Sequence, residues 1–214
     1  MEEYEEYGLT DPEKARLKTF KEKVAGLERE GYIKTDLTAD PDKAHFVGTL
    51  YAFISVLPFI VFYFLLTNEF LDWDKIGVVK TIGLIVLYIV LNILHELIHG
   101  LTWQFFAKNG FRSITFGMIR RTLNPYCSCT ELLSRSHFLI GLMMPWFILG
   151  IIPCIAALIF RSGYLLLFGV LMALSTGGDL LTAQMILTQK NSDKLLYLDH
   201  PISVGAVGLA KIQD

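Results

Sequence analysis

The sequence predicts an all-α polytopic membrane protein, with four transmembrane helices and a small cytoplasmic β-hairpin inserted between the second and the third. The 214-residue chain is 53% hydrophobic and only 19% charged, and its mean hydropathy is +0.46. A soluble domain of this size usually carries more charge. The apolar residues are gathered in four stretches, each long enough to cross a bilayer. One strand–turn–strand pattern interrupts them.

Residues 1–45 are predicted to form a cytoplasmic segment that contains one amphipathic helix. Asp11-Pro12-Glu13 is a typical helix start, in which Asp11 would be the N-cap and Pro12 the first helical residue, and Gly31 is a plausible stop. An apolar stripe lies between them, at Leu17, Phe20, Val24 and Leu27. This stripe indicates that the helix packs against the rest of the protein or lies on the membrane surface, and we favour packing.

Residues 46–190 are predicted to form the transmembrane domain, and residues 191–214 a cytoplasmic tail. By length and apolarity the four spans are residues 46–66, 82–106, 138–160 and 164–187. Pro145 and Pro153 should kink the third span. The stretch from Leu195 to Leu209 in the tail is compatible with a further strand.

The distribution of lysine and arginine predicts the orientation of the spans. The connection 107–137 and the two terminal segments carry most of these residues, whereas the connections on the other side contain only Lys75, Lys80 and Arg161. Basic connections stay on the cytoplasmic side. We therefore expect a multi-pass protein of the plasma membrane, with both termini and the connection 107–137 in the cytoplasm.

The connection 107–137 contains the predicted hairpin. Residues 113–119 and 126–130 are strand-like, and Leu123-Asn124-Pro125 supplies turn residues between them. The first strand offers Phe116, Gly117 and Met118 as candidates for contact with an extended substrate. Cys127 and Cys129 form a Cys-x-Cys pair, which we interpret as reduced thiols packed in the strand rather than as a metal site.

The second span carries the pentad His95-Glu96-Leu97-Ile98-His99. On a helix the two histidines are four residues apart and share one face, so both imidazoles can reach one tetrahedral Zn²⁺. Glu96 beside them is suited to take a proton from a water that the metal activates. The alternative is a polar helix face packed inside the bundle, although ionisable residues are costly within a membrane.

A catalytic zinc needs a third protein ligand, and we predict Asp179. Spans two and four run in the same direction, and at 1.5 Å per residue His95 and Asp179 lie about 20 Å and about 22 Å from the outer face. Gly177 and Gly178 would let another helix approach closely. His137 is the main alternative ligand, and Asp179 could instead only accept a hydrogen bond from Thr182 or from a neighbouring helix. The remaining candidates are His45, Glu131, Asp199 and His200.

Asn92 lies three residues before His95, on the same helix face. Its amide is suited to orient a ligand or to stabilise an oxyanion. An ordinary hydrogen bond between helices explains the residue equally well.

The chain resembles the intramembrane zinc metalloproteases of the site-2 protease type and, more narrowly, the small bacterial membrane proteins grouped as zincin peptidases. The resemblance covers about residues 82–187: a His-Glu-x-x-His span, a kinked span, and Gly177-Gly178-Asp179-Leu180 on the next. It implies His95, His99 and Asp179 as zinc ligands and Glu96 as the catalytic residue. Site-2 proteases usually place the ligand aspartate before a glycine, whereas here the glycines precede it.

We therefore expect zinc-dependent hydrolysis of peptide bonds within or beside the membrane, with a membrane protein or peptide as substrate and an active site open to the cytoplasmic half. A non-catalytic protein that captures substrates, a lipid hydrolase and a metal transporter are the alternatives. Transport is disfavoured because the outer parts of the spans lack charged residues and histidines. A net charge of −2 and the lack of a clustered basic face disfavour nucleic-acid binding.

Overall fold

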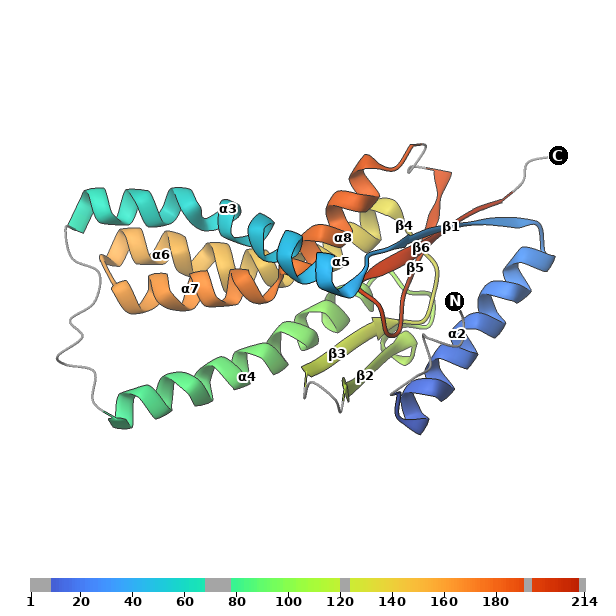
Figure 1. Cartoon of the computed structure of the whole chain (residues 1–214), viewed down its shortest axis with the longest axis horizontal. Coiled ribbons are helices and arrows are strands. Elements are labelled where there is room, and N and C mark those ends of the chain that lie inside the picture. Colours follow the sequence, from blue (N-terminus) through green and yellow to red (C-terminus); the bar gives the residue numbers. More distant parts are fainter. Residues whose placement is uncertain (1–8, 68–77, 120–123, 191–193, 212–214) are drawn as a thin grey trace.

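The computed structural model describes residues 9–67, 78–119, 124–190 and 194–211. Helices gather at one end of an elongated molecule and strands at the other, with helix α2 along the strand end (Figure 1). The helices are α2 (Asp11–Arg29), α3 (Pro41–Thr67), α4 (Val78–Trp103), the 3₁₀ turn η2 (Gly110–Ser113), α5 (Arg135–Pro145), the π-helical segment η3 (Trp146–Ile151), α6 (Ile152–Phe160), α7 (Gly163–Ser175) and α8 (Gly177–Thr188).

Among the described residues, three helices are long and apolar enough to cross a membrane: Ala44–Thr67, Thr81–Trp103 and Arg135–Phe160. They agree with the first three predicted spans. Between Pro145 and Pro153 the third helix passes through the π-helical segment η3, where the sequence predicts a kink.

The fourth predicted span is not one straight helix. It consists of α7 and α8, which are bent by 54° at Thr176, and it qualifies as a fourth span only if the bent pair is counted as one. Ser175 and Thr176 mark the break because their hydroxyl groups donate to backbone carbonyls one turn back, Ser175 to Leu171 and Thr176 to Ala173. Such bonds compete with the regular helix ladder. Asp179 therefore lies in the first turn of a separate helix.

The all-α description is incomplete, because the described residues also form two antiparallel sheets. Strands β2 (Ile114–Ile119) and β3 (Asn124–Cys129) form the predicted hairpin, with Phe116 opposite Cys127. Asn124 and Pro125, which the sequence predicts in its turn, already belong to β3 and pair with Ile119 and Met118, and Leu123 lies outside the described residues. A second sheet has the order β1-β6-β5-β4, from Tyr32–Thr38, Gly205–Lys211, Leu196–Asp199 and Leu133–Ser134. Strand β1 pairs with β6 over its whole length, from Tyr32 opposite Lys211 to Thr38 opposite Gly205. The sheet thus joins the two terminal segments of the chain.

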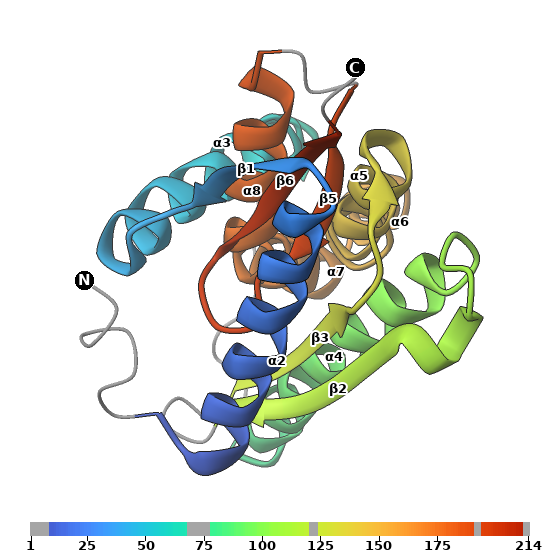
Figure 2. The same ribbon diagram turned by 90° about the vertical axis from the view of Figure 1, so that its right-hand side faces the viewer.

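Helix α2 packs against the strand end, as the apolar stripe predicts. Leu17 and Val24 are buried, and the end-on view shows α2 crossing the hairpin (Figure 2). The predicted cap is shifted by one residue: Thr10 is the N-cap, Asp11 is already helical, and Thr10 and Glu13 form a capping box. Gly31, at φ +87°, ends the turn that leads into β1.

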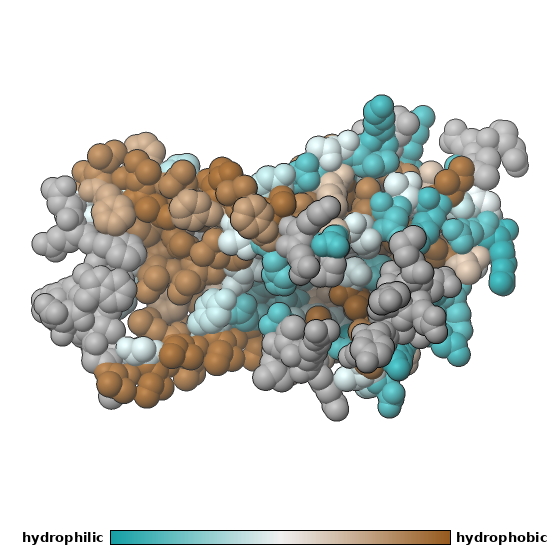
Figure 3. Space-filling view, viewed as in Figure 1, coloured by the Kyte–Doolittle hydropathy of each residue, from teal (hydrophilic) through white to brown (hydrophobic). Residues whose placement is uncertain are grey.

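The surface is divided in the same way as the fold. The helical end is covered by apolar side chains, and the strand end together with α2 is mostly hydrophilic (Figure 3). Large exposed apolar residues follow α3 and α4, among them Phe53, Phe62, Ile85 and Ile89. This division, together with the long apolar helices, is compatible with a multi-pass membrane protein.

A close contact between α3 and α8 positions the start of α8. A Cβ atom added at Gly48 would lie 2.5 Å from the carbonyl oxygen of Gly177, and one added at Gly177 would lie 2.8 Å from the carbonyl carbon of Gly48. Only glycine permits this approach at both positions. The contact that the sequence predicts at the Gly177-Gly178 pair is therefore made by Gly177, while Gly178 faces Val204.

Candidate metal centre

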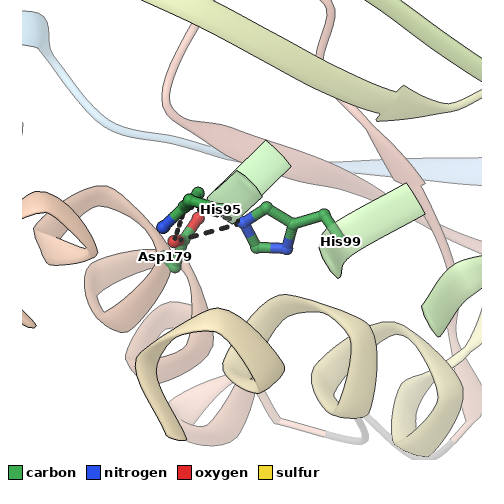
Figure 4. A group of neighbouring side chains, drawn as sticks. All are labelled: His95, His99 and Asp179. Atoms are coloured by element: carbon green, nitrogen blue, oxygen red, sulfur yellow. Dashed lines mark hydrogen bonds and ion pairs between the residues drawn. The ribbon is translucent and has the colours of Figure 1, made fainter. Parts of the chain in front are cut away.

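The structure brings together His95 and His99 from α4 and Asp179 from the first turn of α8 (Figure 4). The two Nε2 atoms are 3.0 Å apart. Asp179 Oδ2 lies 3.2 Å from His95 Nε2 and 3.4 Å from His99 Nε2. Both histidines are buried, and Asp179 keeps 20% of its side-chain surface exposed. Three ligand-type atoms from two helices therefore meet at one partly open point.

His99 is oriented by groups from the third apolar helix. Its Nδ1 lies 2.9 Å from the carbonyl oxygen of Gly141. A carbonyl oxygen can only accept, so Nδ1 must donate, and Nε2 of the neutral ring carries a lone pair toward Asp179. The ring also stacks on Trp103 at 5.1 Å, and Trp103 donates from Nε1 to the carbonyl oxygen of Phe138.

The three donor atoms fit a zinc ion. Ligand atoms at about 2.0–2.1 Å from a tetrahedral zinc lie about 3.3 Å apart, which is close to the three observed separations. Without a cation, the Nε2 lone pair of His99 faces a carboxylate oxygen at 3.4 Å, a contact that only a metal ion or an extra proton relieves. Two imidazoles and one carboxylate are also a frequent donor set in catalytic zinc sites.

Glu96 lies beside the donor cluster, between two cavities. Its Oε1 is 3.9 Å from His95 Nε2, and its carboxylate interacts with the backbone N–H of Cys127 in β3. One cavity of about 200 Å³, which we call the site cavity, is also lined by Asp179, Tyr126 and the residues from Asp199 to Gly205. The other, the bundle cavity, measures about 370 Å³ and is lined by Tyr88, Asn92, His95, Glu96, Met118 and Ser175. Glu96 is thus reachable from two sides.

The other predicted site residues lie at different distances from the cluster. Asn92 lines the bundle cavity and donates from Nδ2 to the carbonyl oxygen of Tyr88. Met118 lines the same cavity, whereas Phe116 packs over Gly100, where an added Cβ would meet its ring at 2.4 Å. Gly117 packs against Tyr126 of the paired strand.

Several candidate ligands are not brought to the cluster. His137 is exposed and stacks on Phe106 at 4.3 Å. His45 is exposed on α3. Glu131 accepts hydrogen bonds from Lys108, Asn109 and Ser113. His200 accepts at Nδ1 from the backbone N–H of Ser203. Cys127 and Cys129 are reduced and buried in β3, as the strand interpretation predicts.

The sequence names Asp199 only as one of the remaining candidate ligands, but the structure places it at the site cavity. It lies at the end of β5, lines the site cavity and interacts with the Ser128 hydroxyl. Burial raises the pKa of Asp199 to about 7, and burial also raises the pKa of Cys129, to about 11. The available signal was the Asp199-His200-Pro201 sequence, which interrupts the largely apolar stretch 195–210. Residues 196–199 lie beside β3 through contacts between distant parts of the sequence. The sequence alone therefore does not place Asp199 near the metal centre.

Two histidines and an aspartate, with a glutamate beside them on a His-Glu-x-x-His helix, form the arrangement of the zinc peptidases. Residues 88–194, half of the chain, match the family described as "Putative zincin peptidase". The chain belongs to this family, and the matched region contains all four of these residues. No curated protein and no solved structure matches the chain.

Proposed function

We propose that this chain is a zinc-dependent protease of the site-2 type that hydrolyses peptide bonds within or beside the membrane. The observation that carries the proposal is the convergence of His95 Nε2, His99 Nε2 and Asp179 Oδ2, with Glu96 next to them. Family membership supports zinc-dependent peptide hydrolysis. The long apolar helix α4, which carries His95, Glu96 and His99, and the bent apolar pair of α7 and α8, which carries Asp179, support a site at membrane depth.

His95, His99 and Asp179 would hold the zinc ion, which when bound supplies Lewis acidity at a carbonyl oxygen and lowers the pKa of a water. Glu96 is the general base: it accepts a proton from the attacking water and returns it to the leaving amine. Its place between the two cavities gives it access to both water and substrate. Asn92 uses one N–H for the Tyr88 carbonyl, which leaves the second N–H of the same amide for a developing oxyanion.

Strand β2 is the proposed substrate-binding edge. Among the described strands it pairs only with β3, so its other edge offers backbone groups to an extended peptide. Phe116, Gly117 and Met118 lie on this strand, and Met118 reaches the bundle cavity beside Glu96. A helical substrate must unwind first, because its amides are otherwise paired within the helix. The positive-inside rule assigns the strand end, and both termini, to the cytoplasm.

The proposal is tested by zinc content and turnover of the full chain purified in detergent. We expect about one zinc per chain in the wild type, in Glu96→Gln and in the control His137→Ala, and loss of zinc in His95→Ala and Asp179→Ala. Glu96→Gln should lower hydrolysis of a quenched fluorescent peptide library by about 10²–10⁴-fold. Turnover that persists in Glu96→Gln, or a wild type that takes up no zinc on reconstitution, contradicts the proposal.

A further inference from the structure

A third cavity lies between α2 and the strands, and we call it the outer cavity. It measures about 290 Å³ and is lined on the α2 side by Arg16, Thr19, Phe20 and Lys23. Tyr126, Ser128, Asp199 and Pro201 line both this cavity and the site cavity that holds Glu96 and Asp179. The outer cavity therefore adjoins the site cavity, with the contact between Ser128 and Asp199 at their common wall.

The α2 wall of the outer cavity is positively charged. Arg16 and Lys23 are seven residues apart, so they lie on the same helix face about two turns from each other. The lining residues include one acid, Asp199, whose carboxyl group already interacts with Ser128. The remaining lining side chains are uncharged, and many of them are apolar. An anionic group with an apolar neighbourhood is the chemistry that complements such a wall.

The guanidinium of Arg16 has unused donors. Its Cζ lies over the ring of Tyr126, 3.8 Å from the ring centroid, in a cation–π contact. Its Nε and Nη1 are buried and have no hydrogen-bond partner in the part of the chain that the structure describes. Glu13 attracts Arg16 electrostatically, but its carboxylate also closes the capping box with Thr10. Buried donors without partners are costly, and a carboxylate oxygen that reaches one of them would form a charge-assisted hydrogen bond.

We propose that the outer cavity is a substrate subsite that receives a carboxylate of the bound peptide, and that Arg16 recognises this group with Lys23 adding to the attraction. This inference rests on the proposed function, and it names the chemistry of the substrate: an acidic residue, or the C-terminus, a short distance along the chain from the scissile bond. A peptide that lies in the site cavity and extends over the common wall at Tyr126 and Ser128 would bring its carboxylate to Arg16. The subsite gives the enzyme a charge preference that the metal centre alone does not supply.

The test measures binding rather than turnover. Full-length Glu96→Gln protein in detergent is titrated into fluorescein-labelled peptides of one apolar sequence with a central Glu, Gln or Lys, all amidated at the C-terminus, and the Kd is read by anisotropy. A fourth peptide has the central Gln and a free C-terminal carboxylate. We expect at least one carboxylate-bearing peptide to bind about tenfold more tightly than the amidated Gln peptide. Which of the two does so identifies the source of the carboxylate.

Variants assign the preference to Arg16. Arg16→Met keeps an apolar chain against Tyr126 and should abolish the preference, whereas Lys14→Ala, on the exposed face of the same helix, should leave it unchanged. Arg16→Glu should reverse it in favour of the Lys peptide, a gain that misfolding cannot produce. Equal Kd values for all four peptides, or a preference that survives Arg16→Met, overturn the inference. If the protein binds zinc and hydrolyses peptides but shows no charge preference, the subsite is wrong and the proposed function stands. If it shows the charge preference but neither zinc nor turnover, the proposed function is wrong.

Discussion

The imidazole ring of His99 is fixed by one contact at its edge and one at its face. Gly141 accepts from Nδ1, and Trp103 stacks on the ring face. Gly141 must lack a side chain, since an added Cβ would lie 2.1 Å from Trp103 Nε1. Spacing alone predicts that His95 and His99 share a helix face, because that relation is local. The Gly141 carbonyl was not predictable from spacing, because it depends on how two helices pack.

Glu131 is a structural carboxylate rather than a ligand. It accepts from the backbone N–H groups of Lys108 and Asn109 and from the Ser113 hydroxyl. The Ser113 hydroxyl and then these N–H groups lower the pKa of Glu131 to about 2. Because the folded-state pKa is depressed, the ionised group stabilises the fold above its unfolded pKa of about 4.3, and this contribution is lost as pH falls toward about 2.

We therefore predict that Glu131→Gln lowers stability at pH 7 by about 1 kcal/mol, a value kept small because the group is exposed and screened by solvent. The difference from the wild type should narrow steadily between pH 4 and pH 2. Thermal unfolding of both proteins in detergent at pH 7, 4 and 3 measures it. A gap of constant size over this range would mean that the charge of Glu131 does not matter.

The break between α7 and α8 sets the position of Asp179. The sequence predicts one span here, because its apolar residues continue through residues 164–187. The bend at Thr176 combines the local hydroxyl bonds of Ser175 and Thr176 with a contact from outside this stretch, the approach of Gly48 to Gly177. The pairing of β1 with β6 also depends on contacts between distant parts of the sequence, since the two strands come from opposite ends of the chain. Local patterns thus predicted most helices and the hairpin, while long-range packing contributed to the bend and decided the second sheet.

We predict that Gly48→Ala weakens the metal centre at a distance. The new Cβ would lie 2.5 Å from the carbonyl oxygen of Gly177, and backbone on both sides cannot yield without moving α8. Overpacking of this kind costs about 1–3 kcal/mol, and the displaced Asp179 should lower zinc affinity. Gly83→Ala in α4 is the matched control, because nothing lies within 4 Å of its added Cβ. Thermal unfolding and zinc titration of both variants measure the effect, and similar results for the two would disprove the role of the contact.

The complete molecule divides into an apolar helical end and a polar strand end, and the donor cluster lies where they meet (Figures 1 and 3). The site cavity and the outer cavity are lined largely by residues of the strand end, and the bundle cavity by α4, α7 and the hairpin. A protease that acts at a membrane needs this arrangement, because its substrate comes from the bilayer while its reaction consumes water. Glu96 lines both the site cavity and the bundle cavity, so under the proposed function it would meet water and substrate there.

This division predicts the topology of the chain in the membrane. Arg161, between α6 and α7, and Lys108, which precedes the hairpin, are both exposed. The turn between α6 and α7 lies at the helical end of the molecule and the hairpin at the strand end (Figure 1). If the strand end is cytoplasmic, as the basic connection 107–137 predicts, a membrane-impermeant maleimide added to intact cells should label Arg161→Cys and not Lys108→Cys. The native cysteines are buried, so background labelling should be low. Labelling of Lys108→Cys alone would place the strand end outside the cell and reverse the proposed orientation, whereas labelling of both only after detergent is added would mean that neither end is exposed to the outside.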